Sequence, residues 1–536
     1  MVKQMSSRFR ASLAIFLAVA ALLVAVHGHR VVATNDEGIV LDAAQRVAGG
    51  ERPYVDFWAY MTPGSYWLQA LVFHLFGVSF LAGRAIVIVD FAVQCALVFW
   101  LTARLASLRA ATVVAFAFFG FQLADPTFLT AQHRWDSSTL ALAGVSMAIS
   151  AASPIAWIAT GAVLAYAAWC TPTVGGVLCV VVGWLLFSKG EQQKCDRRKA
   201  LLPLLAGASV VFAAGAAWLA ATGGLLPLIH QLLWLRTNYL VNAMPYGSII
   251  GGYRALFVDL AGALDLAVRA LLVTCVALPA WLPIVALVAW GLILWKKKVA
   301  AEQASYAVLL LLAGGALILG LSPRPDVTHL AFVVALPYVL AGSAISILVP
   351  ARAGAPLGIC AALLALVFAS NSFNSLRSTS VVASPVGNLR VDNAMRSSME
   401  TLLATVRSGD SMFVYPYMPM NYFITQARNP TEFSFFSPGM ATTNEETVAL
   451  KKLAAHPPEW VLYATVSREQ YLRVVPEGGK TAWRYTGLEE WIEKNYEPVP
   501  HADVDIYGYQ LRRRIHAAQS SVKQSSFDVS GAAPTR

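Results

Sequence analysis

Ionisable residues gather in three short segments at the ends of long apolar runs of this sequence. Charged side chains at a membrane boundary are costly unless they are paired or solvated, so such positions are the first places to look for function. A carboxylate there is a candidate general base, and an Arg or a His is a candidate ligand for an anion. The three groups are Asp36 with Glu37; His133, Arg134 and Asp136, preceded by Asp125; and Arg324, Asp326 and His329.

The first group is a pair of adjacent carboxylates, Asp36 and Glu37, just after the first apolar run. Their mutual repulsion and a low-dielectric surface raise the pKa of at least one of them. A carboxylate with a raised pKa is an effective general base near neutral pH. The alternative is structural, because Asn35, Asp36 and Glu37 also suit the N-terminus of a helix.

The second group lies between two apolar runs and combines a His, an Arg and acidic residues. His133 and Arg134 have the side chains to clamp an anion or to complete a metal site. The structural alternative is an ion pair at the membrane interface, in which Arg134 binds Asp136 or Asp125 and Asp136 caps the next helix.

The third group follows a strongly apolar run and precedes another. Arg324 can bind a phosphate through two parallel hydrogen bonds, and His329 adds a further donor. Asp326 can hold either side chain in orientation. The structural alternative is a turn in which Arg324 extends its charge to the lipid headgroups.

The composition places these groups in a membrane protein. Of 536 residues, 57% are hydrophobic and 13% are charged, whereas soluble domains carry about 25% charged residues. The charge is uneven, since residues 1–371 hold 37 charged side chains and residues 372–536 hold 33. The first region is therefore expected in the membrane and the second in water. Collagen, coiled coil, disordered chain and small disulfide scaffold are excluded.

Eleven apolar runs could act as membrane spans, which need about 17–25 residues, or somewhat fewer inside a bundle. Basic residues concentrate in alternate connections, such as 189–199 and 296–298. The positive-inside rule then puts the N-terminus in the cytoplasm and, after an odd number of spans, the C-terminal region outside. The sequence therefore predicts an α-helical polytopic membrane protein with about eleven transmembrane helices. The runs are 11–32, 81–103, 110–124, 138–152, 155–170, 173–188, 201–222, 269–295, 303–321, 330–349 and 353–371.

These patterns divide the chain into three regions. Residues 1–371 are expected to form a transmembrane domain with long external loops at 33–80 and 223–268. Residues 372–516 alternate strand-like and helix-like runs, which predicts an extracytoplasmic α/β domain. Residues 517–536 are polar, and we expect them to be disordered. The strand-like runs are 411–415, 460–465 and 504–511, and the helix-like runs are 394–406, 443–455 and 486–495.

No common cofactor or metal motif occurs in the sequence. The six cysteines have no CxxC spacing, and Walker A, GxGxxG, HExxH and GxSxG patterns are missing. The net charge of +10 comes mainly from short connections between apolar runs. It is therefore a topology signal and predicts no nucleic-acid partner.

A set of short motifs occupies residues 34–84, beginning with an acidic pair after the first span and ending with Leu-Phe-Gly and an Arg near the second. The motifs are Asp36-Glu37-Gly38, Ala44-Gln45-Arg46, Gly50-Glu51-Arg52-Pro53-Tyr54, Asp56-Phe57, Pro63-Gly64-Ser65-Tyr66, Leu75-Phe76-Gly77 and Arg84. They resemble the N-terminal region of GT-C glycosyltransferases. The most similar branch is the bacterial protein-mannosyltransferase and aminoarabinose-transferase-like group.

The resemblance implies an inverting glycosyltransferase of the bacterial cytoplasmic (inner) membrane. Such an enzyme moves a sugar from a polyprenyl-phosphate donor to a hydroxyl of a glycan, lipid or protein acceptor on the outer side. Asp36 would take the acceptor proton, and Glu37 would assist or bind a divalent cation where one is used. No organic cofactor is implied. The expected substrate-binding residues are Arg324, His329, Asp326, Arg134, His133, Asp56 and Tyr54.

Three alternatives remain open at the level of sequence. A lipid-linked oligosaccharide ligase is the nearest other enzyme. A polytopic transporter or flippase would explain the many spans, and Asp90 is an acid inside a predicted span, but transporters place charged or broken helices at mid-membrane and carry inverted repeats. A membrane-anchored binding protein would not need Asp36, Glu37 or Arg324.

Overall fold

The computed structural model describes ten main stretches and a few short pieces between residues 358 and 370. The main stretches are 2–32, 35–123, 125–187, 197–246, 262–349, 373–436, 441–465, 467–474, 484–499 and 508–515. The predicted disordered tail, 517–536, lies outside the described residues, as does most of the predicted span 353–371.

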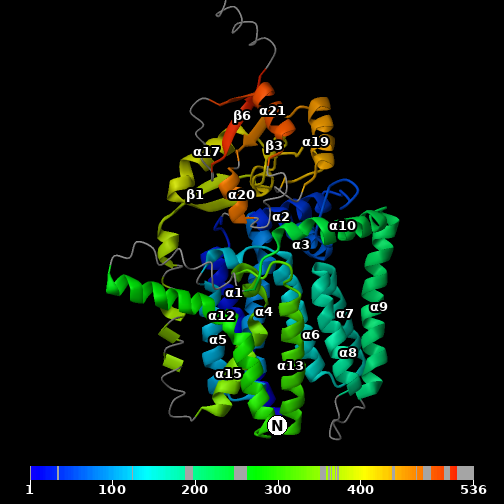
Figure 1. Cartoon of the computed structure of the whole chain (residues 1–536), viewed down its shortest axis with the longest axis vertical. Helices are drawn as coiled ribbons and strands as arrows, with labels where there is room; N and C mark the ends of the chain where they lie inside the picture. Colours follow the sequence, from blue (N-terminus) through cyan, green and yellow to red (C-terminus); the bar gives the residue numbers. More distant parts are fainter. Residues whose placement is uncertain are drawn as a thin grey trace, which may run out of the picture.

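Helices dominate the region before residue 350, and most of them run side by side along the long axis of the molecule (Figure 1). The N-terminus lies at the end of this bundle that is far from the C-terminal domain (Figure 1). The helices are α1 (Val2–His27), α2 (Asn35–Ala48), α3 (Gly64–Phe76), α4 (Phe80–Leu105), α5 (Leu108–Leu123), α6 (His133–Ser150), α7 (Pro154–Cys170), α8 (Gly176–Phe187), α9 (Arg197–Ala221), α10 (Leu225–Asn238), α12 (Ala263–Trp295), α13 (Ala301–Leu319), α14 (Val327–Val333) and α15 (Ala335–Leu348). Short 3₁₀ turns are η1 (Pro126–Leu129), η2 (Pro172–Gly175) and η3 (Tyr239–Asn242).

Each predicted apolar run from 11–32 to 330–349 falls on one of these helices or on a bent pair of them. Among the described residues, four helices are long and apolar enough to cross a membrane, or five if the bent pair α14 and α15 is counted as one span. That pair turns by 67°. The apolar runs between 108 and 187 give shorter helices, as their length predicts.

Three helices lie across the end of the bundle that faces the C-terminal domain (Figure 1). Two of them, α2 and α3, form inside the segment 33–80, which the sequence predicts to be a long loop. The third, α10, replaces part of the predicted loop 223–268. Its sequence, LLPLIHQLLWLRTN, carries enough large apolar side chains to form a helix with a strongly exposed apolar face, including Leu226 and Leu233.

The C-terminal domain is a small α/β unit, as predicted. Its main sheet has the order β3-β4-β6-β5, in which β3 and β4 are parallel and the other pairs antiparallel. A separate hairpin, β1-β2, precedes it. The strands are β1 (Thr379–Ser384), β2 (Gly387–Asp392), β3 (Met412–Tyr415), β4 (Trp460–Tyr463), β5 (Tyr496–Pro498) and β6 (Gln510–Arg514), and the helices are α17 (Arg396–Thr405), α18 (Met420–Thr425), α19 (Thr443–Ala455), α20 (Arg468–Val474) and α21 (Thr486–Asn495).

The predicted helix-like runs of this domain coincide with α17, α19 and α21, and two of the strand-like runs coincide with β3 and β4. The third run, 504–511, overlaps β6 only at its end, and residues 501–507 lie outside the described residues.

The membrane-side helices and the C-terminal domain share a hydrophobic core. One cluster joins Leu41 of α2 and Phe80 of α4 with Met420 and Phe423 of α18. The closest approach is at Gly38, where an added Cβ would lie 2.2 Å from the backbone nitrogen of Met420. No side chain larger than hydrogen fits there without moving α18, so a glycine is needed for α2 to pack this closely.

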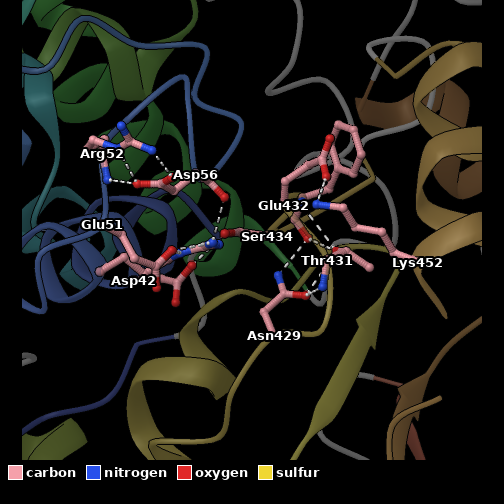
Figure 2. Close-up of polar contacts among 11 residues, drawn as sticks. Asp42, Glu51, Arg52, Asp56, Asn429, Thr431, Glu432, Ser434 and Lys452 are labelled. Carbon is pink, nitrogen blue, oxygen red and sulfur yellow. Dashed lines mark hydrogen bonds and ion pairs between the residues drawn. The ribbon is translucent and has the colours of Figure 1, made fainter. Parts of the chain in front are cut away.

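A polar junction reinforces this packing (Figure 2). The buried carboxylate of Asp42 on α2 accepts a hydrogen bond of 2.5 Å from Ser434 of the C-terminal domain. The backbone N–H of Trp58 donates to the carbonyl of Glu432 at 2.9 Å. Gln426 donates to the side chain of Gln45 at 2.6 Å. The segment 427–436 is therefore fixed against α2 and the loop that follows it.

Candidate functional site

A cavity of about 580 Å³ lies where the bundle, the loop after α2 and the C-terminal domain meet. Members of all three ionisable groups line it, although they are separated by up to about three hundred residues in sequence. They are Asp36, His133, Arg134, Arg324, Asp326 and His329. The structure thus brings into one cavity three groups that the sequence presents as separate candidates.

Asp36 stands in the first turn of α2 and is half-buried at the cavity wall. Burial raises the pKa of this carboxyl, while the positive charges of His329, Arg324 and Arg134 oppose the rise. A carboxylate with a raised pKa inside a cavity is the arrangement that general-base chemistry requires.

Asp326 holds an Arg and a His side chain in place. Arg324 donates through Nε to one of its oxygens at 2.9 Å, and His329 contacts the other through Nδ1 at 2.6 Å. The backbone N–H of His329 also donates to Asp326, which caps α14. Although burial alone would raise the pKa of Asp326, its bonds to His329 and Arg324 hold that pKa below the usual range. Arg324 also donates to Asn242 at 3.2 Å, so its guanidinium is oriented from two sides.

The second group opens α6 at the cavity wall. His133 contacts the hydroxyl of Thr171 through Nδ1 at 2.8 Å. Arg134 is half-buried and lines the cavity, and it has no ion pair or side-chain hydrogen bond within the described part of the chain. The ion pair that the sequence suggested for Arg134, with Asp136 or Asp125, is not formed there, because Asp125 instead caps η1 by accepting from Thr127.

Asp136 turns away from the cavity into the bundle. It is buried among the helices and is not a lining residue of the cavity. The acid inside a predicted span, Asp90, is likewise buried in the bundle.

Glu37 is not at the cavity wall, unlike its neighbour Asp36. Its side chain is fully buried, with one oxygen 2.7 Å from Nε of Arg84 and the other accepting from Nη2 of Arg84 at 2.8 Å. The backbone N–H of Ala131 donates to it at 3.1 Å. Glu37 therefore ties α2 to α4 and to the segment that leads into His133.

Tyr54 and Asp56 also lie outside the cavity lining. The hydroxyl of Tyr54 donates to the carbonyl of Met61 at 2.5 Å, and Met61 is a lining residue. Asp56 accepts from the backbone and the guanidinium of Arg52 at 2.7 to 2.9 Å on the surface of the loop (Figure 2). Both residues shape the loop between α2 and α3.

Several lining residues were not picked out from the sequence. Tyr239 and Asn242 lie in the segment 223–268, whose richness in Tyr and Asn was a usable signal. Tyr417 and Phe435 come from the C-terminal domain, and nothing in their sequence context indicates a site. The residues that the structure adds are Tyr60, Thr171, Thr173, Arg236, Tyr239, Asn242, Tyr417 and Phe435.

The cavity wall does not present a metal-ligand set. Its two carboxylates are Asp36 and Asp326, and Asp326 is occupied by His329 and Arg324. Within the described stretches, no group of three or more His, Cys, Asp or Glu side chains is arranged to hold a metal ion.

No protein-family model and no curated protein matches the chain. Among solved structures, it is similar to an oligosaccharyltransferase from Archaeoglobus fulgidus in complex with Zn and sulfate, with a TM-score of 0.46 and 11% identity over 84% of this chain and 67% of that one. It is also similar to ArnT from Cupriavidus metallidurans bound to undecaprenyl phosphate, with a TM-score of 0.44 and 14% identity over 94% and 98% of the two chains. The same ArnT in the apo state gives a TM-score of 0.39 and 12% identity over the same shares.

Proposed function

We propose that this protein is a GT-C-type inverting glycosyltransferase, which moves a sugar from a polyprenyl-phosphate donor to a hydroxyl acceptor. One observation carries the proposal. A carboxylate with a raised pKa, Asp36, shares a cavity with Arg134, whose guanidinium is unpaired within the described part of the chain, and with the oriented pair Arg324 and His329. A base and a cationic anion site in one cavity are what such a transfer requires.

Asp36 acts as the base in this proposal. The acceptor oxygen attacks the anomeric carbon, its proton passes to Asp36, and the bond between that carbon and the phosphate oxygen breaks. The polyprenyl phosphate leaves with the bonding electrons. Because a phosphate is a good leaving group, no general acid is required. A single displacement inverts the configuration at the anomeric carbon, whereas retention would need a nucleophilic intermediate.

The phosphate binds to the cations of the cavity. Arg134 is a half-buried cation of the cavity whose donors are unused within the described part of the chain, so it can give two parallel N–H groups to phosphate oxygens. Arg324 is already oriented by Asp326 and adds positive charge beside it, and His329, which Asp326 also orients, adds a hydrogen-bonding imidazole. Donors fixed in this way stabilise the charge that grows on the leaving phosphate without having to reorganise.

The placement of the cavity supports a donor that is anchored in lipid. Residues of α2 and α10, two of the helices that run across the end of the apolar bundle, line it. A lipid phosphate can keep its isoprenoid chain among apolar helices while its headgroup enters the cavity. With the basic connections of the sequence, this supports the outer side of a bacterial cytoplasmic membrane as the place of reaction.

Two residues of the motif set in 34–84 support the GT-C reading in a further way. Glu37 and Arg84, from opposite ends of that segment, form the buried ion pair that positions α2 against α4. The motif that resembles the family is thus also the one that places Asp36. A lipid-linked oligosaccharide ligase would use the same base and cations, and the donor it accepts distinguishes it.

The test is transfer by purified protein in detergent with radiolabelled polyprenyl-phosphate sugars and membrane lipids or glycans as acceptors. We expect an inverted product and a decrease of about 10²–10⁴-fold for Asp36→Asn, the usual worth of general-base catalysis. Glu51→Gln is the matched control, because Glu51 is a half-exposed carboxylate of the same loop outside the cavity. Full activity of Asp36→Asn would reject the proposed base, and transfer only from diphosphate-linked oligosaccharides would favour the ligase.

A further inference from the structure

The space between Asp36 and Arg324 is bordered by tyrosines from three parts of the chain. Asp36 is close enough to Tyr60 and Tyr239 for its charge to act on both hydroxyl groups. Arg324 is in the same electrostatic reach of Tyr239 and Tyr417. All three tyrosines line the cavity.

In a displacement reaction, the sugar lies between the base and the cationic side chains that bind the phosphate. The acceptor oxygen beside the base and the phosphate beside the cations must lie on opposite sides of the anomeric carbon. The reacting atoms must approach to about 3–3.5 Å, so the sugar ring fills this gap. The tyrosines that border the gap therefore border the sugar.

The aromatic side of the gap is built largely by the C-terminal domain. The ring of Phe435 lies 5.7 Å from that of Tyr60 and 6.0 Å from that of Tyr417, both edge-on. Trp58 packs behind Phe435 at 5.5 Å. These rings are the apolar face of a pocket whose polar groups fix orientation, which is the usual construction of a small-molecule site.

The segment that carries Phe435 is held rigidly. Ser434 donates to the buried Asp42, Glu432 accepts from the backbone of Trp58, and the backbone N–H of Phe436 donates to the carbonyl of Pro416 at 2.5 Å. Figure 2 shows the first of these contacts, with Asp42 and Ser434 reaching toward each other from the two domains. A ring held by such contacts can discriminate between ligands, because it does not move to accommodate each of them.

We infer that Tyr417 and Phe435 of the C-terminal domain contact the transferred sugar and determine which sugar the site accepts. The inference rests on the proposed function and assigns to the C-terminal domain a direct part in donor recognition. Tyr60 and Tyr239 supply hydroxyl groups within electrostatic reach of Asp36. The ligand class is a single hydroxylated sugar ring on a lipid phosphate.

The experiment compares binding of polyprenyl phosphate with and without a sugar. The probes are sugar-free polyprenyl phosphate and the same lipid carrying a hexose, a pentose or an amino sugar, with the full-length protein in detergent. The quantity measured is the sugar increment, which is the ratio of the affinity for the sugar-carrying lipid to the affinity for the sugar-free lipid. We expect Tyr417→Leu and Phe435→Leu each to lower the sugar increment of the preferred sugar about 3–10-fold, as expected for lost aromatic contacts. Affinity for the sugar-free lipid should stay at the wild-type value.

Phe433→Leu is the matched control, because Phe433 is a buried ring of the same segment that contacts Trp58 and Phe436 but does not line the cavity. Tyr417→Phe keeps the ring, so it should retain sugar discrimination even if the Leu variants prove unstable. An unchanged sugar increment in the Tyr417 and Phe435 variants, with transfer intact, would overturn the inference and leave the proposed function standing. Wild-type protein that gains no affinity from any sugar and transfers none would overturn both.

Discussion

The guanidinium of Arg84 meets both oxygens of Glu37 inside the protein, with Nη2 donating at 2.8 Å and Nε lying 2.7 Å from the other oxygen. Neither side chain is exposed to solvent. Because successive residues of a helix point about 100° apart, the neighbour of Glu37, Asp36, faces the cavity when Glu37 faces Arg84. The ion pair therefore sets the direction of the candidate base.

The first prediction concerns the stability that depends on this pair. Glu37→Gln leaves the charge of Arg84 buried and unpaired, so we expect a loss of about 3–5 kcal/mol in the free energy of unfolding. Thermal or denaturant unfolding in detergent measures it. Glu51→Gln makes the same substitution in a pair whose carboxylate is half-exposed, Arg46 with Glu51, and should cost about 0–1 kcal/mol. Equal losses in the two variants would contradict this account of the Glu37 pair.

The second prediction concerns the phosphate ligand. Arg134→Gln removes the guanidinium that has no protein partner in the described chain, and charge-assisted bonds of this kind are worth about 1.5–3 kcal/mol each. We therefore expect kcat/KM for a polyprenyl-phosphate sugar to fall about 10–100-fold, with little change in unfolding temperature.

Two further variants separate charge from position. Arg324→Lys keeps the charge but loses the hydrogen bonds to Asp326 and Asn242, so an intermediate loss is expected. Arg52→Gln, on the surface of the first external loop, should leave kcat/KM unchanged. An Arg134→Gln variant that binds the lipid phosphate as tightly as wild type would exclude Arg134 as its ligand.

The third prediction concerns pH. Burial raises the pKa of Asp36, so activity should fall on acidification at a pH above the ordinary titration range of an aspartate. Protonation removes the base, and the loss therefore runs in the acidic direction. The positive charges of His329, Arg324 and Arg134 oppose the rise, while Asp326 adds to it.

Removing one of those cations should shift the acid limb of kcat/KM to higher pH. A nearby cation favours the ionised carboxylate. If the charge of Arg134 acts on Asp36, the residual activity of Arg134→Gln should therefore have its acid limb at higher pH than wild type. The matched variant Arg52→Gln should leave the limb where it is. A shift in the opposite direction, or no acid limb in wild type, would contradict Asp36 as the titrating base.

The fourth prediction concerns the contact between α2 and α18. Gly38→Ala puts a methyl group against the backbone of Met420, and the helices must separate to admit it. We expect a loss of about 1–3 kcal/mol in unfolding free energy, typical of overpacking. Gly183→Ala on α8 is the control, since nothing lies within 4 Å of its added Cβ. A stable Gly38→Ala variant would show that this interface has room to adjust.

Most helices of the bundle could be predicted from the sequence, because long hydrophobic runs separated by basic connections are typical of membrane helices. The sequence also singled out Asp36, Arg324 and His329, which all line the cavity. The sequence could not show which of Asp36 and Glu37 faces the cavity, because the directions of their side chains depend on how α2 is rotated relative to Arg84. Likewise, Asp136 is close to His133 and Arg134 in sequence, but it is buried and does not line the cavity.

The contribution of the C-terminal domain was beyond sequence reasoning for a different reason. Tyr417 and Phe435 reach the cavity only because α18 packs on α2 across nearly four hundred residues of chain. Local propensity and periodicity predict the strands and helices of this domain, yet they carry no information about which surface it docks on.

The hydrophobic cluster shared by α2 and α18 limits which C-terminal domains could replace the present one in a recombined chain. A replacement of everything after residue 372 would bring a new surface against Gly38, and the helix turn that presents Asp36 would move with it. The C-terminal domain is consequently not an exchangeable module. It and the first external loop must be inherited together, as one unit, for the cavity to keep its shape.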